Sequence, residues 1–222
     1  MKKIVSLLLA VMVLSAFTLR QDKQKILFFG DSITQAGVNP GGYITRMTEI
    51  IRQKGLTDKY ELVGKGIGGN KVYDLYLRMD EDVLSQSPNV VVIWVGVNDV
   101  WHKRSYGTGT DPDKFEKFYT AIIKKLQAKQ ITVYMCTPAA IGEKTDFSNE
   151  LDGDLNEYSN IIRKIAKANN CGLIDLRKSF LAYNLEQNKE NKVSGILTTD
   201  RVHLNEKGNE LVATEMVKVL IK

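Results

Sequence analysis

The chain has 222 residues, 43% hydrophobic and 26% charged, a composition typical of one globular domain with a buried core. Its formal charge of +5 is too small, and its lysines too scattered, to predict a nucleic-acid partner. Only two histidines are present, which argues against a histidine-based metal site.

The N-terminal segment predicts a signal peptide over residues 1–19. Lys2 and Lys3 precede an apolar run over residues 4–17, and a polar stretch begins at Arg20. This order of basic, apolar and polar segments is typical of export signals. A buried strand or a membrane anchor is the alternative, but the run is shorter than the roughly 20 residues that cross a bilayer. We therefore expect an exported protein, periplasmic or secreted, without a stable membrane anchor, and one domain over residues 20–222.

Short apolar runs after this segment predict five β-strands. Most are nearly continuous rather than alternating, as expected of parallel strands that are covered on both faces. The runs cover residues 25–29, 60–63, 90–95, 131–135 and 172–176.

Segments with helical spacing separate or follow the later strands. One apolar stripe extends from Phe115 to Leu126, another from Leu151 to Ile165, and a last one lies between Glu206 and Leu220. Strands that alternate with helices predict a three-layer α/β/α sandwich around a five-stranded parallel sheet. Between the strands, residues 105–113 predict a surface loop, followed by a helix that Asp111 and Pro112 cap.

Polar residues and glycines gather where the predicted strands end. Ser32 follows the first strand, residues 66–70 follow the second and residues 96–98 follow the third. Ligand sites in parallel sheets lie beyond the carboxyl ends of the strands. We therefore expect these three segments to meet at one site.

Several familiar catalytic and binding motifs are absent from the sequence. There is no GxSxG nucleophile elbow, no HExxH zinc motif, no CxxC pair and no Walker A loop. Cys136 and Cys171 are read as small buried side chains, although an exported chain could oxidise them to a disulfide. No feature predicts a metal or an organic cofactor, and none specifies an oligomeric state.

Ser32 and His203 are the residues best suited to nucleophilic catalysis. A serine hydroxyl needs a base to remove its proton, and an imidazole base needs a third group that holds its tautomer. Asp200 stands three residues before His203, so its carboxylate can reach Nδ1 and leave Nε2 free to face Ser32. We expect these three side chains to form a catalytic triad.

Four short blocks in this order resemble the SGNH, or GDSL-like, hydrolase family. They are Gly30-Asp-Ser32-Ile, Gly68-Gly-Asn70, Gly96-Val-Asn-Asp99 and Asp200-Arg-Val-His203. The resemblance implies a flavodoxin-like fold and cofactor-free hydrolysis of esters or thioesters. It also implies an oxyanion hole made by the backbone N–H groups of Ser32 and Gly69 and by the side-chain amide of Asn98, with Gly68 as the alternative to Gly69. The sequence departs from the family pattern at Ile33, Gly64 and Lys71.

Three aromatic or imidazole side chains are candidates for the substrate pocket. Trp101 and His102 follow the third block, and Tyr43 lies in the first crossover. An exposed pair that only covers nearby apolar surface is the alternative for Trp101 and His102. Asp31 and Asp99 are acidic and close to the site, and we expect both to brace their loops by hydrogen bonds to backbone.

The resemblance favours an exported serine esterase that cleaves acyl esters, with short-chain or acetyl groups preferred and carbohydrate O-acetyl esters as one substrate class. The expected partner is a small-molecule or glycan ester. A lysophospholipase or thioesterase would use the same mechanism. A glycan-binding protein without turnover and an FMN carrier are alternatives from other classes. The intact Ser32, Asp200 and His203 disfavour the first, and the distal Asp-His segment disfavours the second.

Overall fold

The computed structural model describes residues 22–222, and the predicted signal peptide over residues 1–19 lies outside them. Its centre is a sheet of five parallel strands: β1 (Gln24–Gly30), β2 (Tyr60–Gly66), β3 (Val90–Trp94), β4 (Thr132–Cys136) and β5 (Gly172–Ile174). The strand order is β2-β1-β3-β4-β5. This order is that of flavodoxin-like folds, which place a topological switch point between β1 and β3.

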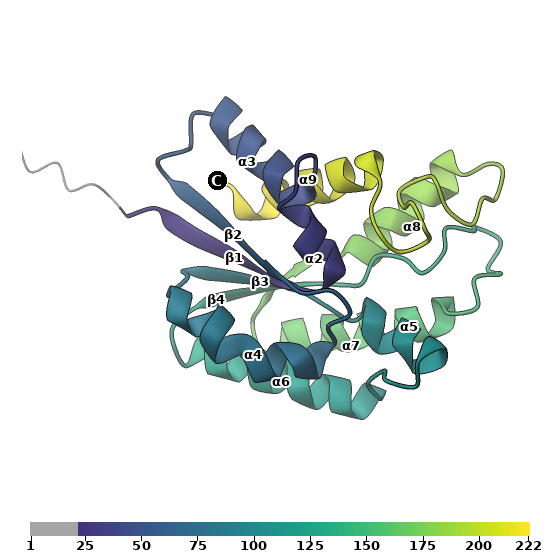
Figure 1. Ribbon diagram of the computed structural model, residues 1–222, viewed down its shortest axis with the longest axis horizontal. Helices are drawn as coiled ribbons and strands as arrows, with labels where there is room; N and C mark the ends of the chain where they lie inside the picture. The colour runs from purple at the N-terminus through teal and green to yellow at the C-terminus, as the bar shows by residue number, and fades with distance from the viewer. Residues whose placement is uncertain (1–21) are drawn as a thin grey trace, which may run out of the picture.

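Helices cover both faces of the sheet, so the molecule has three layers (Figure 1). The helices are α2 (Ser32–Gly37), α3 (Tyr43–Gln53), α4 (Val72–Asp82), α5 (Val97–Ser105), α6 (Pro112–Gln127), α7 (Asp152–Ala168), α8 (Leu176–Gln187) and α9 (Glu206–Leu220), with a short 3-10 turn at Leu84–Gln86. One side carries α3, α8 and α9, and the other carries α4, α6 and α7. The predicted α/β/α sandwich is confirmed.

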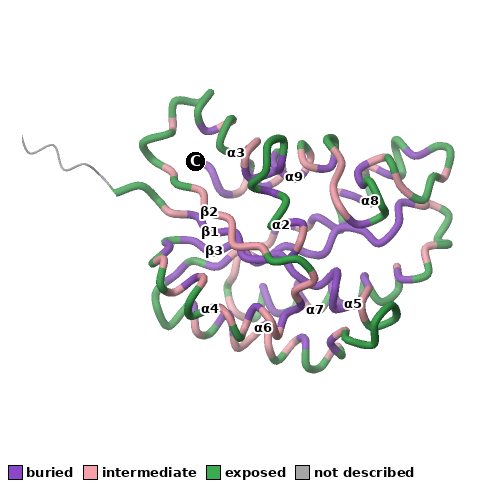
Figure 2. The backbone as a smooth tube through the Cα atoms, viewed as in Figure 1, coloured by how far each residue is buried: buried purple, intermediate pink, exposed green. Residues whose placement is uncertain are grey.

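The core lies where the central strands meet these helices. All residues of β3 are buried, as are the last five of β1, whereas β2 at the sheet edge is only half-buried. Figure 2 shows this buried centre within a more exposed ring of helices and loops. The apolar stripes of α6, α7 and α9 point into it, because their spacing places them on one helical face.

Several predicted boundaries differ from the structure. The fifth strand ends at Ile174, because Asp175 caps α8 by accepting a hydrogen bond from the Lys178 N–H. The loop predicted from residue 105 is confirmed, since α5 ends at Ser105 and α6 begins at Pro112. Asp111 occupies the N-cap position of α6 and Pro112 follows in the first turn, as predicted. The Asp111 side chain makes no capping hydrogen bond, and its carboxylate pairs with the Lys103 ammonium at 2.8 Å.

The second strand is longer than its apolar run, and it continues to Gly66. A Cβ atom at Gly66 would lie 2.0 Å from the backbone nitrogen of Gln35, so only glycine lets β2 approach α2 this closely. Hydrophobicity cannot reveal this extension, because it consists of two glycines and a lysine.

Both cysteines carry free thiols in the structure. Cys136 is buried at the carboxyl end of β4, and Cys171 is half-buried just before β5 begins. Burial raises the pKa of both thiols, which keeps them protonated and unreactive. None of the helices between residues 22 and 222 has the length and apolarity that a membrane crossing requires.

Candidate active site

Ser32 lies at the first turn of α2, directly beyond the carboxyl end of β1. The preceding residue, Asp31, occupies the N-cap position, and its carboxylate accepts a hydrogen bond from the Ile33 N–H at 3.0 Å. Ser32 itself is half-buried, so its hydroxyl is accessible from outside the sheet. The sharp strand-to-helix turn thus presents a serine side chain at the topological switch point.

Three side chains from the two ends of the chain form one hydrogen-bonded series. Ser32 Oγ lies 2.9 Å from Nε2 of His203, and Nδ1 of the same ring lies 2.7 Å from Oδ2 of Asp200. The structure therefore brings together the three residues that the sequence predicts as a catalytic triad. A neutral imidazole with its proton on Nδ1 can take the serine proton through Nε2.

The turn that carries His203 is held by its own acid. Oδ1 of Asp200 accepts hydrogen bonds from the backbone N–H groups of Val202 at 3.1 Å and His203 at 2.8 Å. Partial burial alone would raise the pKa of Asp200, but the hydrogen bonds from the His203 ring and from these two N–H groups outweigh it and lower the pKa. Asp200 is consequently an anion that can orient the imidazole and stabilise its protonated form.

The loop after β2 brings backbone N–H groups close to Ser32. Gly69 has a φ of +76°, a left-handed conformation that favours glycine. The Gly68 N–H is occupied, because it donates to Oε1 of Gln35 at 2.9 Å. Within residues 22–222, the N–H groups of Ser32 and Gly69 have no hydrogen-bond partner. Of the two glycines, Gly69 is the one with a free donor.

Asn98 lies in the first turn of α5 and is buried. One amide hydrogen of Asn98 binds the Asn70 carbonyl oxygen at 3.1 Å, which leaves the second hydrogen for another acceptor. The neighbouring Asp99 carboxylate accepts the Val72 N–H, with N–O distances of 3.2 and 3.3 Å. These contacts fix the loop between β2 and α4 against α5.

Two buried carboxyl groups lie beneath the site. Burial raises the pKa of Asp31 and that of Asp99 from the ordinary value of 3.8 to about 7. Charge on His203 and on Arg78 opposes this effect at Asp31, while the negative charge of Asp31 adds to it at Asp99. Both side chains accept backbone N–H groups, so the expected loop-bracing contacts are confirmed.

Tyr43 does not belong to the substrate pocket, and that prediction is wrong. Its side chain is completely buried at the start of α3, where it packs edge-on against Phe28 and Trp94. The hydroxyl group donates to Oγ1 of Thr34 at 3.2 Å. The aromatic ring fills the core under α2 because α3 turns this first residue toward the sheet.

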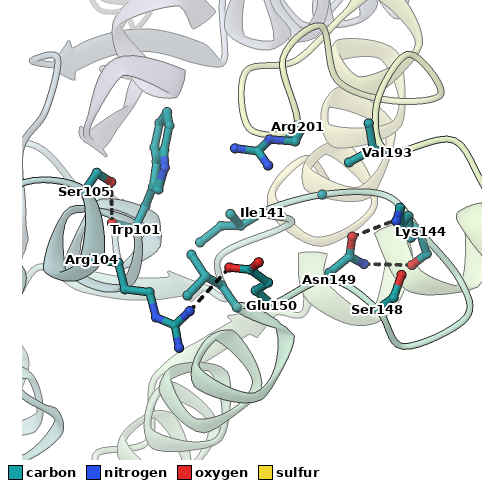
Figure 3. Close-up of a pocket in the computed structure, with 12 residues that line it drawn as sticks. Trp101, Arg104, Ser105, Ile141, Lys144, Ser148, Asn149, Glu150, Val193 and Arg201 are labelled. Atoms are coloured by element: carbon teal, nitrogen blue, oxygen red, sulfur yellow. Dashed lines mark hydrogen bonds and ion pairs between the residues drawn. The ribbon is translucent and has the colours of Figure 1, made fainter.

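Trp101 and His102 are both half-buried on α5, at the rim of the site. Cε1 of His102 lies 3.8 Å from the position that a Cβ atom would take on Gly69, so the imidazole borders the loop that holds Gly69. Partial burial and then the charge of Lys71 lower the pKa of His102, which favours a neutral ring. Trp101 lines a neighbouring pocket together with Arg201 (Figure 3).

Glu143 is a supporting residue that the sequence patterns do not reveal. Its carboxylate is buried and accepts the N–H groups of Ile196, Leu197 and Thr198 at 2.9, 2.6 and 2.9 Å. This segment leads directly into the Asp200–His203 turn, and Thr198 forms an antiparallel bridge with Leu204 across it. A lone acid in a loop carries no motif, so only the fold shows that Glu143 anchors the turn.

Arg78 supports the other side of the site, and the sequence patterns do not reveal it either. From α4, its guanidinium donates to the Gly30 carbonyl at 2.8 Å and to Oδ1 of Asn70 at 2.7 Å, and it pairs with Asp82 at 2.6 Å. It thereby ties the end of β1 to the loop that holds Gly69. In the sequence, Arg78 is one of many basic residues on amphipathic helices.

Fold and site together define the class of protein, a hydrolase with a serine at the switch point of the parallel sheet in an α/β/α sandwich. The chain belongs to the GDSL-like lipase/acylhydrolase family, whose model matches residues 28–211. The family resemblance that the sequence blocks predict is therefore confirmed.

Curated relatives and solved structures support this membership. An acetylxylan esterase of Geobacillus stearothermophilus is 26% identical over 211 residues, which cover 88% of this chain and 93% of that protein. An isoamyl acetate-hydrolyzing esterase of Schizosaccharomyces pombe is 24% identical over 202 residues, 89% of this chain and 75% of that protein. The crystal structure of an acetyl xylan esterase, AlAXEase, is 70% identical with a TM-score of 0.88, covering 89% of this chain and 100% of that one. The protein is thus a carboxylic ester hydrolase.

Proposed function

We propose that the protein is a carbohydrate O-acetyl esterase that removes acetyl groups from xylan or xylooligosaccharides. The observation that carries this proposal is the series Ser32–His203–Asp200, with distances of 2.9 and 2.7 Å, in a chain 70% identical to a solved acetyl xylan esterase. The hydrogen-bonded series supports ester cleavage by serine. The similarity to the solved esterase supports an acetylated xylan as the substrate.

The reaction would proceed through an acetyl-enzyme. Ser32 Oγ attacks the acetyl carbonyl carbon while His203 Nε2 takes the hydroxyl proton. The tetrahedral intermediate collapses when His203 returns that proton to the sugar oxygen, which leaves as an alcohol. Water then attacks the acetyl-enzyme with His203 again as base, and acetate and free Ser32 result.

The negative oxygen of the intermediate would meet three donors. The N–H groups of Ser32 and Gly69 have no other acceptor within the described chain, and the Asn98 amide has one hydrogen available. Preorganised donors of this kind stabilise the transition state more than the ground state. Their neutrality keeps them available across the working pH range.

The neighbouring pocket supports a polar alcohol rather than a lipid. Its lining includes the charged residues Arg104, Lys144, Glu150 and Arg201, together with Trp101. A long acyl chain or a lysophospholipid tail would bury apolar surface against these charges, which is unfavourable. This lining favours a sugar ester over the lysophospholipase alternative.

We also propose that the protein is exported, as the order of segments in residues 1–19 indicates. Acetylated plant polysaccharides lie outside cells, so export would bring enzyme and substrate together. Cleavage and export can be measured by mass spectrometry of the protein from the culture medium or periplasm, where the mature chain should lack Lys2 and Lys3.

The decisive experiment measures acetate release from acetylated xylooligosaccharides, with p-nitrophenyl palmitate and lysophosphatidylcholine as competing substrates. We expect kcat/KM for the oligosaccharides to exceed that for either lipid substrate by at least roughly 100-fold, because four charged side chains line the pocket described above. Ser32→Ala provides the matched background. Preferential hydrolysis of the lipids would contradict the proposal, and binding of the oligosaccharides without acetate release would favour a glycan-binding protein.

A further inference from the structure

A pocket of about 370 Å³ opens beside the turn that carries Asp200 and His203. The pocket is lined in part by Arg201, which lies between Asp200 and His203 in the chain. The buried Ile141 also lines the pocket. Figure 3 shows the Arg201 guanidinium directed toward the Trp101 indole across the pocket. The ester chemistry itself uses none of these side chains.

Basic side chains outnumber acidic ones in this pocket. Arg104, Lys144 and Arg201 contribute positive charge, whereas Glu150 is the single acid among the lining residues. Glu150 is already bound to Arg104 at 3.4 Å. The Arg201 side chain has no hydrogen bond or ion pair with any residue in the part of the chain that the structure describes. Arg201, two residues before His203 in the chain, therefore has an exposed guanidinium with its five N–H donors available.

The backbone of Arg201 is held in place although its side chain is not. Its φ is +84°, in the left-handed region that costs a non-glycine residue on the order of 1 kcal/mol. The Arg201 carbonyl accepts the Gly142 N–H at 2.9 Å, and the flanking turn is fixed by Asp200. A strained but anchored backbone positions this guanidinium over the pocket.

The opposite side of the pocket suits a sugar ring. The Trp101 indole is half-buried on α5, so one part of its surface is available to the pocket. A pyranose ring presents a face of C–H groups that can cover such an aromatic surface, while its polar substituents point outward. Arginine matches a carboxylate better than a hydroxyl, because its planar fork makes two parallel hydrogen bonds to the two oxygens.

We propose that this pocket is an anion subsite in which Arg201 binds the carboxylate of a uronic-acid substituent near the acetylated sugar. The preferred substrates are acidic, acetylated xylooligosaccharides rather than neutral ones. This inference rests on the proposed function and adds the residue and the charge that determine specificity.

The test compares two acetylated xylooligosaccharides of equal length, one with and one without a glucuronate substituent. For each enzyme we take the ratio of kcat/KM for the acidic and the neutral oligosaccharide, and we measure p-nitrophenyl acetate hydrolysis to verify a folded active site. The wild-type ratio should be roughly 10, since a charge-assisted bidentate contact is worth about a tenfold change. Arg201→Gln should bring the ratio close to one, and Arg201→Lys should give an intermediate value.

Lys103→Gln is the matched control. Lys103 lies on α5, is exposed and pairs with Asp111, so its substitution removes the same unit of charge without touching the pocket. The ratio in this variant should stay within a factor of about two of the wild-type value, because screened long-range attraction is weak.

The outcomes separate the subsite from the function on which it rests. Acetate release from both oligosaccharides with a wild-type ratio near one overturns the subsite and leaves the proposed function intact. An equal fall in ratio for Arg201→Gln and Lys103→Gln also overturns it, because general electrostatics then explains the preference. Hydrolysis of p-nitrophenyl acetate with no acetate released from either oligosaccharide overturns the proposed function, and the subsite with it.

Discussion

Ser32 Oγ and His203 Nε2 lie 2.9 Å apart although 171 positions separate the two residues in the chain. Two separate sets of hydrogen bonds hold these side chains in position. The Asp31 cap fixes the start of α2, and the Asp200 carboxylate fixes the His203 turn through two backbone N–H groups. A proton can therefore pass between the two side chains without a rearrangement of the fold.

Asp200→Asn should lower kcat for p-nitrophenyl acetate by roughly 10³–10⁴-fold, as loss of the triad acid does in other serine hydrolases. The amide would favour the wrong imidazole tautomer, while its oxygen could still accept the Val202 and His203 N–H groups. Steady-state kinetics measures the loss, and a thermal melt verifies the fold. A decrease of less than about tenfold would show that Asp200 does not orient His203 during the reaction.

Asn98→Ala should reduce kcat by roughly 10²–10³-fold, the usual effect of removing one oxyanion donor. KM should change much less, because the donor acts mainly on the transition state. The variant also loses the hydrogen bond to Asn70, so its stability should fall by about 1 kcal/mol.

Asn89→Ala is the control for this loss of stability. Asn89 precedes β3 at the opposite end of the sheet and accepts the Lys25 N–H at 2.7 Å. Its replacement should cost similar stability with kcat unchanged. If both asparagine variants lose kcat to the same extent, the Asn98 effect is structural and the oxyanion role is wrong.

Glu143→Gln should lower both stability and turnover. The amide NH2 group would face at least one of the backbone N–H groups that the carboxylate now accepts, which leaves buried donors unpaired at a cost of about 1–3 kcal/mol. Displacement of the His203 turn should reduce kcat by roughly 10–100-fold. Denaturant unfolding and p-nitrophenyl acetate kinetics measure the two effects.

The matched control for Glu143 is Glu116, which is half-buried on α6 and pairs with the exposed Lys164 of α7. Glu116→Gln should change neither quantity appreciably, because an ion pair with a solvent-exposed lysine contributes little. A Glu143→Gln enzyme with normal kcat at temperatures where it is folded would show that the carboxylate stabilises the loop without positioning His203.

Asp31→Asn should alter how stability depends on pH. Burial raises the pKa of Asp31 from 3.8 to about 7, so the folded protein holds this proton more tightly than the unfolded chain does. The resulting stabilisation is complete below about pH 4 and is lost as the pH rises to 7, by roughly 1.4 kcal/mol for each pKa unit. Asparagine does not ionise, so the variant should lose less stability over this range.

Urea unfolding at several pH values between 4 and 8 measures this difference. Asp99, whose pKa burial also raises to about 7, stays in the variant and should preserve part of the slope. Parallel stability curves for wild type and Asp31→Asn would contradict the assignment of a raised pKa to Asp31.

The parts of this protein that its sequence predicts well are those governed by continuous hydrophobic patterns and by strand ends. The runs around β1 and β3 predict buried parallel strands, and the placement of Ser32 and Asn98 after them predicts their convergence at one edge. The Asp-x-x-His spacing predicts the ring contact of His203, since both partners lie within one short turn.

Other features depend on contacts between segments that no local pattern encodes. The position of Tyr43 in the first crossover predicts a place in the pocket, yet α3 turns its side chain into the core. Glu143 and Arg78 each anchor the backbone of a segment far away in the sequence, and a bond to a backbone atom leaves no pattern of residue types to recognise. The free donor at Gly69 becomes evident only once Gln35 is seen to occupy Gly68.

The most direct test of the account is covalent labelling with a p-nitrophenyl alkylphosphonate, followed by intact-mass and peptide-mapping mass spectrometry. A single adduct should form on Ser32, esterase activity should fall in proportion to labelling, and His203→Ala should be labelled much more slowly. Inactivation with the adduct on a different residue, or full activity after Ser32 is modified, would contradict Ser32 as the nucleophile.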